Sequence, residues 1–431
     1  MPLQLLHSSD ARFAEAFARL VARRESERSE VDQAVAAILA DVRERGDAAL
    51  LEATRRFDGY RLGPSEIEVP RSEIESAGER LEPAQREALR VAAERIREFH
   101  ASQRPESWRL ERDGDLLGQE LRPLERIGIY VPGAQAPLAS SLLMLGIPAE
   151  VAGVEERVVV SPARRHAPAI LEAARLAGIS RVFRVGGAQS IAALAYGTET
   201  LPAVDKIVGP GSVWTQAAKR QVFGRVAIDS DAGPSEVLVL ADSSARPDWV
   251  AADLLAQAEH DEAASVVLAT PSESLARDSL AHLERLLTET PRAAVARHSL
   301  ASRSLAIVTR DLDEAIELSN RYAPEHLEIV TREPEALLPR VRHAGAVFLG
   351  GRSTVPLGDY VAGPSHVLPT GGSARFFSVL GVEDFLRRMS VIRLGSATVR
   401  QVGPHAIVLA ELEGLFAHAA ALRARLEELG D

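Results

Sequence analysis

A glutamate and a histidine stand side by side at Glu325 and His326, directly after a proline. These two side-chain types most often transfer protons near neutral pH, so the pair is a candidate acid–base couple. Pro324 disfavours the helical region for Ala323, so the helical pattern before it should end there. The apolar run over 327–330 predicts a strand. The pair is therefore expected at a helix-to-strand junction, although an adjacent Glu–His pair taken alone is more often a surface feature.

A polar stripe interrupts the helical pattern expected over 247–262, which begins with a proline suited to a first helical turn. Gln257 and His260 are three residues apart and so lie on one helix face, with Asp253 four residues before Gln257. On this pattern alone, a solvated helix face is the commoner interpretation. An amide oxygen is an uncommon zinc ligand, so the spacing alone does not identify a metal site.

Two further histidines stand in distinctive surroundings. His366 and Asp359 belong to 358–371, a polar stretch punctuated by glycine and proline, and a long loop of this kind inside a compact domain is commonly functional. His418 lies among apolar residues of the expected C-terminal helix, where a core or interface histidine is the simpler interpretation. These residues remain candidates until a wider pattern connects them.

Glycine-bearing turns follow three of the expected strands, at 130–133, 185–189 and 208–212. None of them is the G-x-G-x-x-G dinucleotide fingerprint, and each one alone could merely make a tight turn. The helices that follow offer free N–H groups, which suit a phosphate. Three such turns at the carboxyl ends of neighbouring strands favour a ligand site, because ligands bind there in open α/β sheets.

Composition limits the classes of function. The 431 residues predict two to four domains, and 46% hydrophobic with 26% charged residues excludes global disorder. A formal charge of −11 argues against a nucleic-acid partner. The chain has no cysteine, so a metal would need histidine, carboxylate or amide ligands. It shows neither a signal peptide nor a long apolar segment, so we expect a cytoplasmic protein without a membrane partner.

Short β-branched runs alternate with helical patterns, as in parallel βαβ units. Residues 10–105 read as a helical N-terminal part, and the chain should return to helix after 381. The expected units are a Rossmann-like domain at 126–234, a discontinuous α/β domain formed by 1–125 and 235–380, and a helical tail at 381–431. The expected strands are 127–131, 157–160, 182–185, 206–208, 236–240, 265–269, 305–308, 327–330 and 346–349.

Eight motifs, in their order along the chain, resemble those of the histidinol dehydrogenase family. The resemblance runs from about residue 30 to the end, and several of the motifs are long, which makes it specific. The motifs are 130–133, 184–189, 195–200, 206–211, 232–237, 257–261, 322–327 and 366–370.

The resemblance implies an NAD-dependent homodimer with shared active sites and one zinc ion per subunit. It implies oxidation of L-histidinol to L-histidine through L-histidinaldehyde, the last steps of histidine biosynthesis, in two hydride transfers. It also implies an α/β fold of two Rossmann-like parallel-sheet domains, with a helical N-terminal part. The discontinuous domain would carry the acid–base pair and most metal ligands, and the small helical C-terminal tail would be exchanged in the dimer.

The resemblance assigns roles to residues that match its motifs. Glu325 and His326 are implied as the acid–base pair. The implied zinc ligands are Gln257, His260, Asp359 and His418, with the histidine at 418 reaching in from the partner subunit. The implied substrate contacts are these four residues together with Ser235, His326, His366 and Glu413. The implied NAD contacts are Tyr130, Gln189 and Ser212.

Physical chemistry agrees with these roles. Histidinol carries an imidazole and an amine, both of which suit a borderline metal that orients the molecule. A neutral His326 suits removal of the alcohol proton, and Glu325 suits activation of the water that the aldehyde step needs. Glu413 suits the substrate ammonium. Its five-residue offset from His418 is roughly 140° on an ideal helix, so we expect side-chain reach or an irregularity at Gly414 to bring both to one site.

Three departures from the family pattern concern its ligand-binding loops. Ser212 and Ser365 stand where the family usually has asparagine, and the loop from Ala134 to Leu138 is atypical. One alternative is therefore a zinc- and NAD-dependent paralogue that acts on another amino or sulfonated polyol. Another is a non-catalytic NAD- or metal-binding protein, against which the presence of Glu325 and His326 argues.

Overall fold

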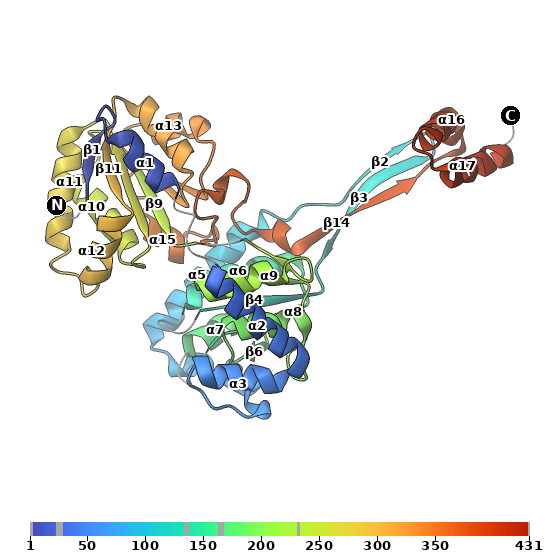
Figure 1. The fold of residues 1–431 in the computed structure, drawn as a ribbon, viewed down its shortest axis with the longest axis horizontal. Coiled ribbons are helices and arrows are strands. Elements are labelled where there is room, and N and C mark those ends of the chain that lie inside the picture. Colours follow the sequence, from blue (N-terminus) through green and yellow to red (C-terminus); the bar gives the residue numbers. More distant parts are fainter. Residues whose placement is uncertain (1–2, 23–28, 133–137, 163–167, 231–232, 430–431) are drawn as a thin grey trace.

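The computed structural model describes residues 3–22, 29–132, 138–162, 168–230 and 233–429. It has two α/β lobes and an arm that projects away from both of them (Figure 1). No described helix is long and apolar enough to cross a membrane.

The first lobe is built on a six-stranded parallel sheet with the order β1-β11-β10-β9-β12-β13. Its inner strands are runs of Val, Leu and Ile because helices cover both faces. One face packs against α10, α11 and α12, and the other against α1 and α13. The strands are β1 Leu5–His7, β9 Glu236–Ala241, β10 Ser265–Thr270, β11 Leu305–Val308, β12 His326–Val330 and β13 Ala346–Leu349. The helices are α1 Phe13–Val21, α10 Pro247–Ala258, α11 Glu273–Leu286, α12 Ala293–Ser302, α13 Leu312–Tyr322, α14 Pro334–Leu337 and α15 Val355–Tyr360.

The second lobe is built on a five-stranded parallel sheet with the order β6-β5-β4-β7-β8. Helices again cover both faces, with α4–α7 on one side and α2, α3, α8 and α9 on the other. The strands are β4 Arg126–Tyr130, β5 Glu156–Val160, β6 Arg181–Phe183, β7 Lys206–Val208 and β8 Ala227–Ile228. The helices are α2 Ser29–Arg45, α3 Asp47–Phe57, α4 Arg71–Glu75, α5 Pro83–Ala101, α6 Ala139–Ala152, α7 Pro168–Leu176, α8 Gly187–Tyr196 and α9 Val213–Val222.

The two sheets share one strand order. In each sheet the first strand of the unit is central, the second and third lie on one side, and the fourth and fifth on the other. The six-stranded sheet adds β1 outside its third strand. This confirms the expectation of two Rossmann-like parallel sheets, and it places a topological switch point between β4 and β7 and another between β9 and β12.

The packing of the N-terminal helices differs from the expected grouping of 1–125 with 235–380. Of the elements described before residue 125, β1 and α1 are the ones that join the six-stranded sheet. Helices α2 to α5 pack against α6 to α9 of the five-stranded lobe. An amphipathic pattern shows that a helix has an apolar face, but it does not show which sheet that face covers.

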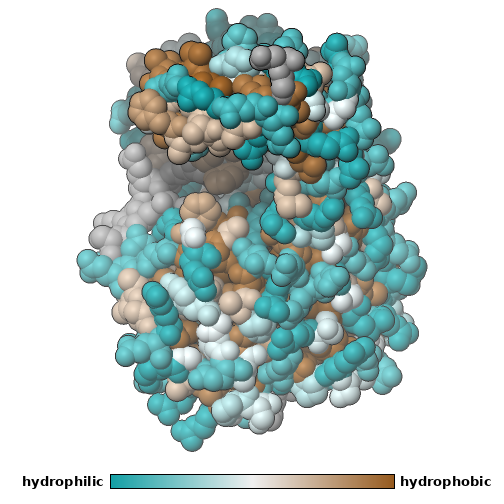
Figure 2. Space-filling view, turned by 90° about the vertical axis from the view of Figure 1, so that its right-hand side faces the viewer, coloured by the Kyte–Doolittle hydropathy of each residue, from teal (hydrophilic) through white to brown (hydrophobic). Residues whose placement is uncertain are grey.

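The arm is a three-stranded antiparallel sheet that ends in two helices. It consists of β2 Trp108–Arg112, β3 Asp115–Pro123, β14 Leu386–Arg393, α16 Ser396–Leu412 and α17 Phe416–Leu429. The expectation of helix directly after 381 is wrong over β14, which pairs along its whole length with β3. Apolar side chains gather on the upper part of the molecule in the view that faces the arm (Figure 2). Exposed ones on α16, α17 and their connection are Val402, Val408, Leu409, Leu412, Leu415 and Phe416.

Candidate active site

Glu325 and His326 lie at the expected helix-to-strand junction. Helix α13 ends at Tyr322 because Ala323 adopts a left-handed conformation with φ +51°, and β12 begins at His326. Glu325 is 6% exposed and His326 is 4% exposed. The pair is therefore buried in the first lobe, at the amino end of β12, and does not lie on the surface.

The hydrogen bond of His326 determines its tautomer. Its Nδ1 lies 2.9 Å from the carbonyl oxygen of Glu236 in the neighbouring strand β9. A carbonyl only accepts, so Nδ1 carries the proton and Nε2 of the neutral ring is bare. Burial, together with the nearby His260 and His366, lowers the pKa of His326 to about 4, although the hydrogen bond with Glu236 acts in the opposite direction. Nε2 makes no hydrogen bond within the described residues, so it can accept a proton from a bound molecule.

Glu325 is held by the same strand. Its Oε2 accepts the N–H of Glu236 at 2.7 Å and lies 3.5 Å from Nδ1 of His326. Burial raises the pKa of Glu325 well above its ordinary value. A raised pKa makes the ionised carboxylate a stronger base, as water activation requires.

Three of the expected metal ligands lie on elements of the same lobe, and two of them, Asp359 and His260, interact with this pair. Gln257 lies on the last turn of α10, His260 follows that helix, and Asp359 lies on the last turn of α15. Oδ1 of Asp359 is 3.9 Å from Nε2 of His326, and His260 is close enough to act electrostatically on that ring. Residues more than 100 positions apart thus meet at the amino ends of β9, β10 and β12.

The residues present fit a cation. Gln257 is 2% exposed, and neither atom of its amide has a hydrogen-bond partner in the described chain. Burial raises the pKa of Asp359 to about 7 because few groups nearby stabilise its charge. Unsatisfied buried amides and carboxylates are costly, and a zinc ion would satisfy both groups.

The four expected ligands do not come together within the described residues of one chain. Among the described residues, no three His, Asp or Glu side chains come together as a metal site. His260 is exposed. His418 lies in α17 at the tip of the arm, far from α10 and α15 of its own chain (Figure 1).

The expected irregularity beside His418 is present. Helix α16 ends at Leu412, Gly414 has φ +73°, and α17 starts at Phe416. Glu413 and His418 therefore do not share one continuous helix, and the ideal 140° offset does not apply to them.

The substrate-side loop connects the two lobes. His366 contacts the carbonyl oxygen of Asp359 through Nδ1 at 2.8 Å, and Ser141 Oγ on α6 through Nε2 at 3.1 Å. Ser235 directly precedes β9 at the same edge, while the hydroxyl of the buried Ser365 accepts the N–H of Val367. The carboxyl ends of the five-stranded sheet therefore face the amino ends of the six-stranded sheet.

Glu236 is a site residue that the sequence reasoning missed. It holds Glu325 and His326 through its main chain, and its side chain accepts the N–H of Gly371 at 3.0 Å. The available signal was a charged residue at the head of an otherwise apolar strand, where a buried carboxylate must have a structural partner.

The expected dinucleotide contacts gather at the carboxyl ends of the five-stranded sheet. Tyr130 ends β4, Gln189 lies in the first turn of α8, and Ser212 is the N-cap of α9. Thr215 joins two of them, because Tyr130 hydrogen-bonds to its side chain and Ser212 Oγ lies 3.5 Å from its main-chain nitrogen. Asp58 accepts a hydrogen bond from Gln189 at 3.4 Å. Residues 133–137, including the atypical Ala134, lie outside the described residues.

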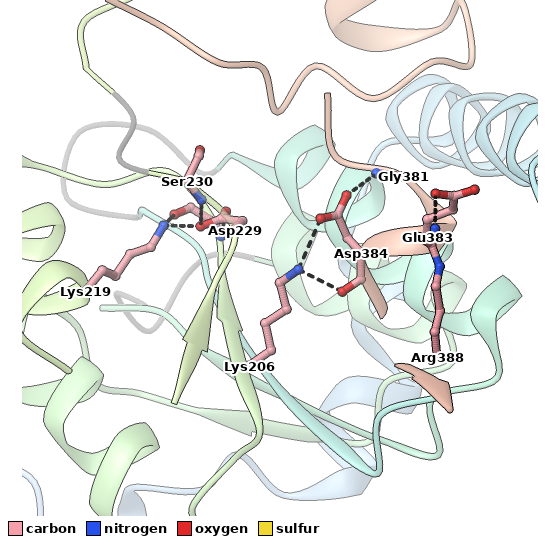
Figure 3. A network of polar contacts seen from close by, with 9 residues as sticks. Lys206, Lys219, Asp229, Ser230, Gly381, Glu383, Asp384 and Arg388 are labelled. Atoms are coloured by element: carbon pink, nitrogen blue, oxygen red, sulfur yellow. Dashed lines mark hydrogen bonds and ion pairs between the residues drawn. The ribbon is translucent and has the colours of Figure 1, made fainter. Parts of the chain in front are cut away.

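A buried ion pair supports the loop after β7 (Figure 3). Lys219 pairs with Asp229 and donates to the carbonyl oxygen of Gly209 at 2.9 Å, while Asp229 accepts the N–H of Gly209 at 2.7 Å. Gly209 has φ +124°, and a side chain there would collide with the main chain of Tyr130. The pair thus holds this loop tightly against the end of β4.

A second network in the same view ties the arm to the five-stranded lobe (Figure 3). Lys206 in β7 donates to the main-chain oxygen of Asp384 at 2.7 Å and pairs with its carboxylate at 3.1 Å. Asp384 belongs to the 3₁₀ turn Val382–Phe385, directly before β14. The base of the arm is therefore anchored, although its tip projects away.

Comparison with known proteins agrees with this geometry. The sequence profile described as histidinol dehydrogenase matches residues 21–426. The chain is 51% identical to the histidinol dehydrogenase of Aquifex aeolicus over 425 residues, which cover 99% of each chain. It is also 51% identical to the histidinol dehydrogenase of Chromobacterium violaceum, over 98% of each chain. The crystal structure of histidinol dehydrogenase from Elizabethkingia anophelis superposes with a TM-score of 0.94 at 37% identity, over 100% of this chain and 99% of the other.

Proposed function

The chain belongs to the histidinol dehydrogenase family and is an oxidoreductase, and from this premise we propose that it oxidises L-histidinol to L-histidine with NAD and zinc. The first half-reaction converts alcohol and NAD⁺ to aldehyde, NADH and a proton. The second converts the aldehyde, water and a second NAD⁺ to carboxylate, NADH and protons.

The bare Nε2 of His326 carries this proposal. It is buried, neutral and directed toward the space beside Asp359. In the first step Nε2 takes the hydroxyl proton of the substrate while hydride leaves the carbinol carbon. In the second step Glu325 takes a proton from the water that adds to the aldehyde, and hydride leaves the hydrated carbon.

Gln257, His260 and Asp359 would hold zinc, which when bound orients the imidazole and amine of the substrate as a Lewis acid. The unpartnered amide of Gln257 supports this role. Tyr130, Gln189 and Ser212 would hold the dinucleotide, with the N-terminus of α9 near its phosphates. Ser235 and His366 would contact the substrate from the six-stranded lobe.

The arm would complete the site in a homodimer. His418 of the partner subunit would be the fourth zinc ligand, and Glu413 of the partner subunit would pair with the substrate ammonium. Two features support the exchange: α17 lies far from the site of its own chain, and the tip of the arm exposes a set of large apolar side chains.

The rival substrate class is another amino or sulfonated polyol. Ser212 supports it, because its short side chain acts as a helix cap at the dinucleotide end instead of reaching outward. Retained histidine and carboxylate groups around His326 support L-histidinol.

The deciding experiment measures NADH formed per L-histidinol consumed, with and without prior chelation of the metal. We expect two NADH per substrate, and loss of turnover after chelation that zinc restores. A ratio of one would exclude the two-step oxidation, whereas turnover of a different polyol without any turnover of L-histidinol would establish the rival. Ligand binding without turnover of any alcohol would indicate a binding protein.

A further inference from the structure

A second polar cluster lies behind the site and takes no part in the steps above. Glu328 in β12 is 1% exposed, and its Oε1 accepts the N–H of Val355 at 2.9 Å. Oδ1 of Asp253 in α10 accepts the hydroxyl of Thr354 at 2.6 Å. The carboxyl groups of Asp253 and Glu328 also hydrogen-bond to each other.

On each of three elements, a residue of this cluster lies about one helical turn, or two strand residues, away from a site residue. Asp253 is one helical turn before Gln257 on α10. Glu328 is two residues after His326, on the same face of β12. Thr354 and Val355 begin α15, whose last turn carries Asp359. The elements that carry the proton acceptor and two candidate metal ligands are therefore joined directly behind the site.

A hydrogen bond between two carboxyl groups requires a proton. Oε2 of Glu328 is buried and receives no hydrogen bond from an N–H or hydroxyl group of the described residues. Burial is the main cause that raises the pKa of both Asp253 and Glu328, and the two groups interact. Two adjacent buried carboxylates repel strongly when both are ionised, so one proton shared between them supplies the missing donor.

We propose that Asp253 and Glu328 share one proton and act as positioning residues that fix the spacing of α10, β12 and α15. This inference rests on the proposed function, because the spacing matters for the metal held by Gln257 and Asp359 and for the reach of His326. The pair acts through those residues. Its loss would widen or tilt the ligand set, since each helix would lose the contact that seats it on β12.

The test compares two substitutions of nearly equal volume. Glu328→Gln supplies a permanent N–H donor toward Asp253 and keeps an acceptor for Val355, whereas Glu328→Leu removes every polar contact. We expect Glu328→Gln to keep the zinc affinity within about threefold of wild type. We expect Glu328→Leu to lose about 10- to 100-fold, the range typical of groups that support metal ligands. The visible spectrum of the cobalt(II)-loaded protein should match wild type in the first variant and change in the second.

The control variant is Glu172→Leu. Glu172 is a buried carboxylate of α7, in the other lobe, paired with Arg175. Its removal should lower the melting temperature without changing zinc affinity or the cobalt spectrum. This control separates a loss of positioning from a general loss of stability.

Each outcome has a distinct meaning. A Glu328→Leu protein with wild-type zinc affinity and cobalt spectrum refutes the inference, and Glu328→Gln as damaged as Glu328→Leu refutes the shared proton. If Glu328→Leu does not fold, Thr354→Val is the deciding variant. A reduced zinc affinity in this folded variant supports the positioning role of the cluster, and an unchanged zinc affinity refutes it. Wild-type dimer that binds no stoichiometric zinc refutes the proposed metal site itself.

Discussion

His326 donates its Nδ1 proton to the main-chain carbonyl of Glu236, 2.9 Å away on the neighbouring strand. Because the acceptor is a carbonyl, the bond can form with only one neutral tautomer of the ring. It therefore leaves Nε2 unprotonated and directed toward the space beside Asp359. Glu236 also donates its N–H to Glu325, so one residue of β9 orients both Glu325 and His326.

Replacement of His326 by asparagine separates this orientation from catalysis. The shorter amide can still donate to the carbonyl of Glu236, but it offers no base. We expect kcat for alcohol oxidation to fall about 10²- to 10⁴-fold, with a melting temperature close to wild type. Steady-state kinetics and calorimetry test this, and a variant with near-normal kcat would remove His326 from the proposed role.

Glu325→Gln should affect the two half-reactions unequally. The amide keeps an oxygen acceptor for Glu236 but cannot take a proton from water. Oxidation of supplied L-histidinaldehyde should therefore slow more than oxidation of L-histidinol to the aldehyde. Single-turnover measurements of each half-reaction provide the check, and equal slowing of both would indicate a purely structural effect.

Hybrid dimers test the shared site. Neither the His418→Ala nor the Glu325→Gln homodimer should form L-histidine at a significant rate, and His418→Ala should also lose zinc. In a hybrid, one site carries both changes and the other carries neither. Unfolding and refolding an equal mixture should recover about a quarter of wild-type activity, because half of randomly assorted dimers are hybrids with one intact site. No recovery, with dimers formed, would place His418 in the site of its own chain.

Lys219→Met should weaken both stability and dinucleotide binding. The substitution leaves the buried carboxylate of Asp229 without its cation, which typically costs about 3–5 kcal/mol. It also releases the carbonyl of Gly209, so KM for NAD should rise. Urea denaturation and kinetics measure the two effects. The double variant Lys219→Met with Asp229→Asn should regain part of the stability, and no regain would mean that the charge pair is not the cause.

Asp58 predicts a pH dependence of stability. Burial raises its pKa from 3.8 to about 6, while a hydrogen bond from the N–H of Gly186 lowers it. The folded state thus holds the proton more tightly than the unfolded state, and stability falls as pH rises from about 4 through 6. Asp58→Asn removes this loss. The variant should be more stable than wild type by roughly 1–3 kcal/mol above pH 7 and equal to it near pH 4.

Urea denaturation of both proteins between pH 4 and 8 measures this difference. Asparagine keeps an acceptor for Gln189, so the hydrogen bond itself is preserved. A stability difference that stays constant with pH would contradict the raised pKa.

The sequence was informative where residue periodicity and burial coincide. Nine of the eleven described strands in the two parallel sheets were predicted within a few residues, whereas β1 and β8 were not, and Pro324 correctly marked the end of α13. The arm was missed because β2 is wholly exposed and β14 mostly so, and neither strand buries an apolar face. Asp253 was placed in a stripe that helical spacing alone assigns to solvent, whereas it contacts the buried Glu328. Its partner Glu328 is 75 residues away in the sequence, and the pattern of neighbouring residues cannot predict such a distant contact.

Under the proposed exchange of the arm, catalytic activity depends on protein concentration. A freshly folded single chain would possess its proton acceptor and three ligands, yet it would have no finished catalytic centre until it met another copy. Activity during refolding should therefore appear with second-order kinetics, after secondary structure is complete. Dilution should abolish activity because the dimer dissociates, while circular dichroism still shows folded lobes.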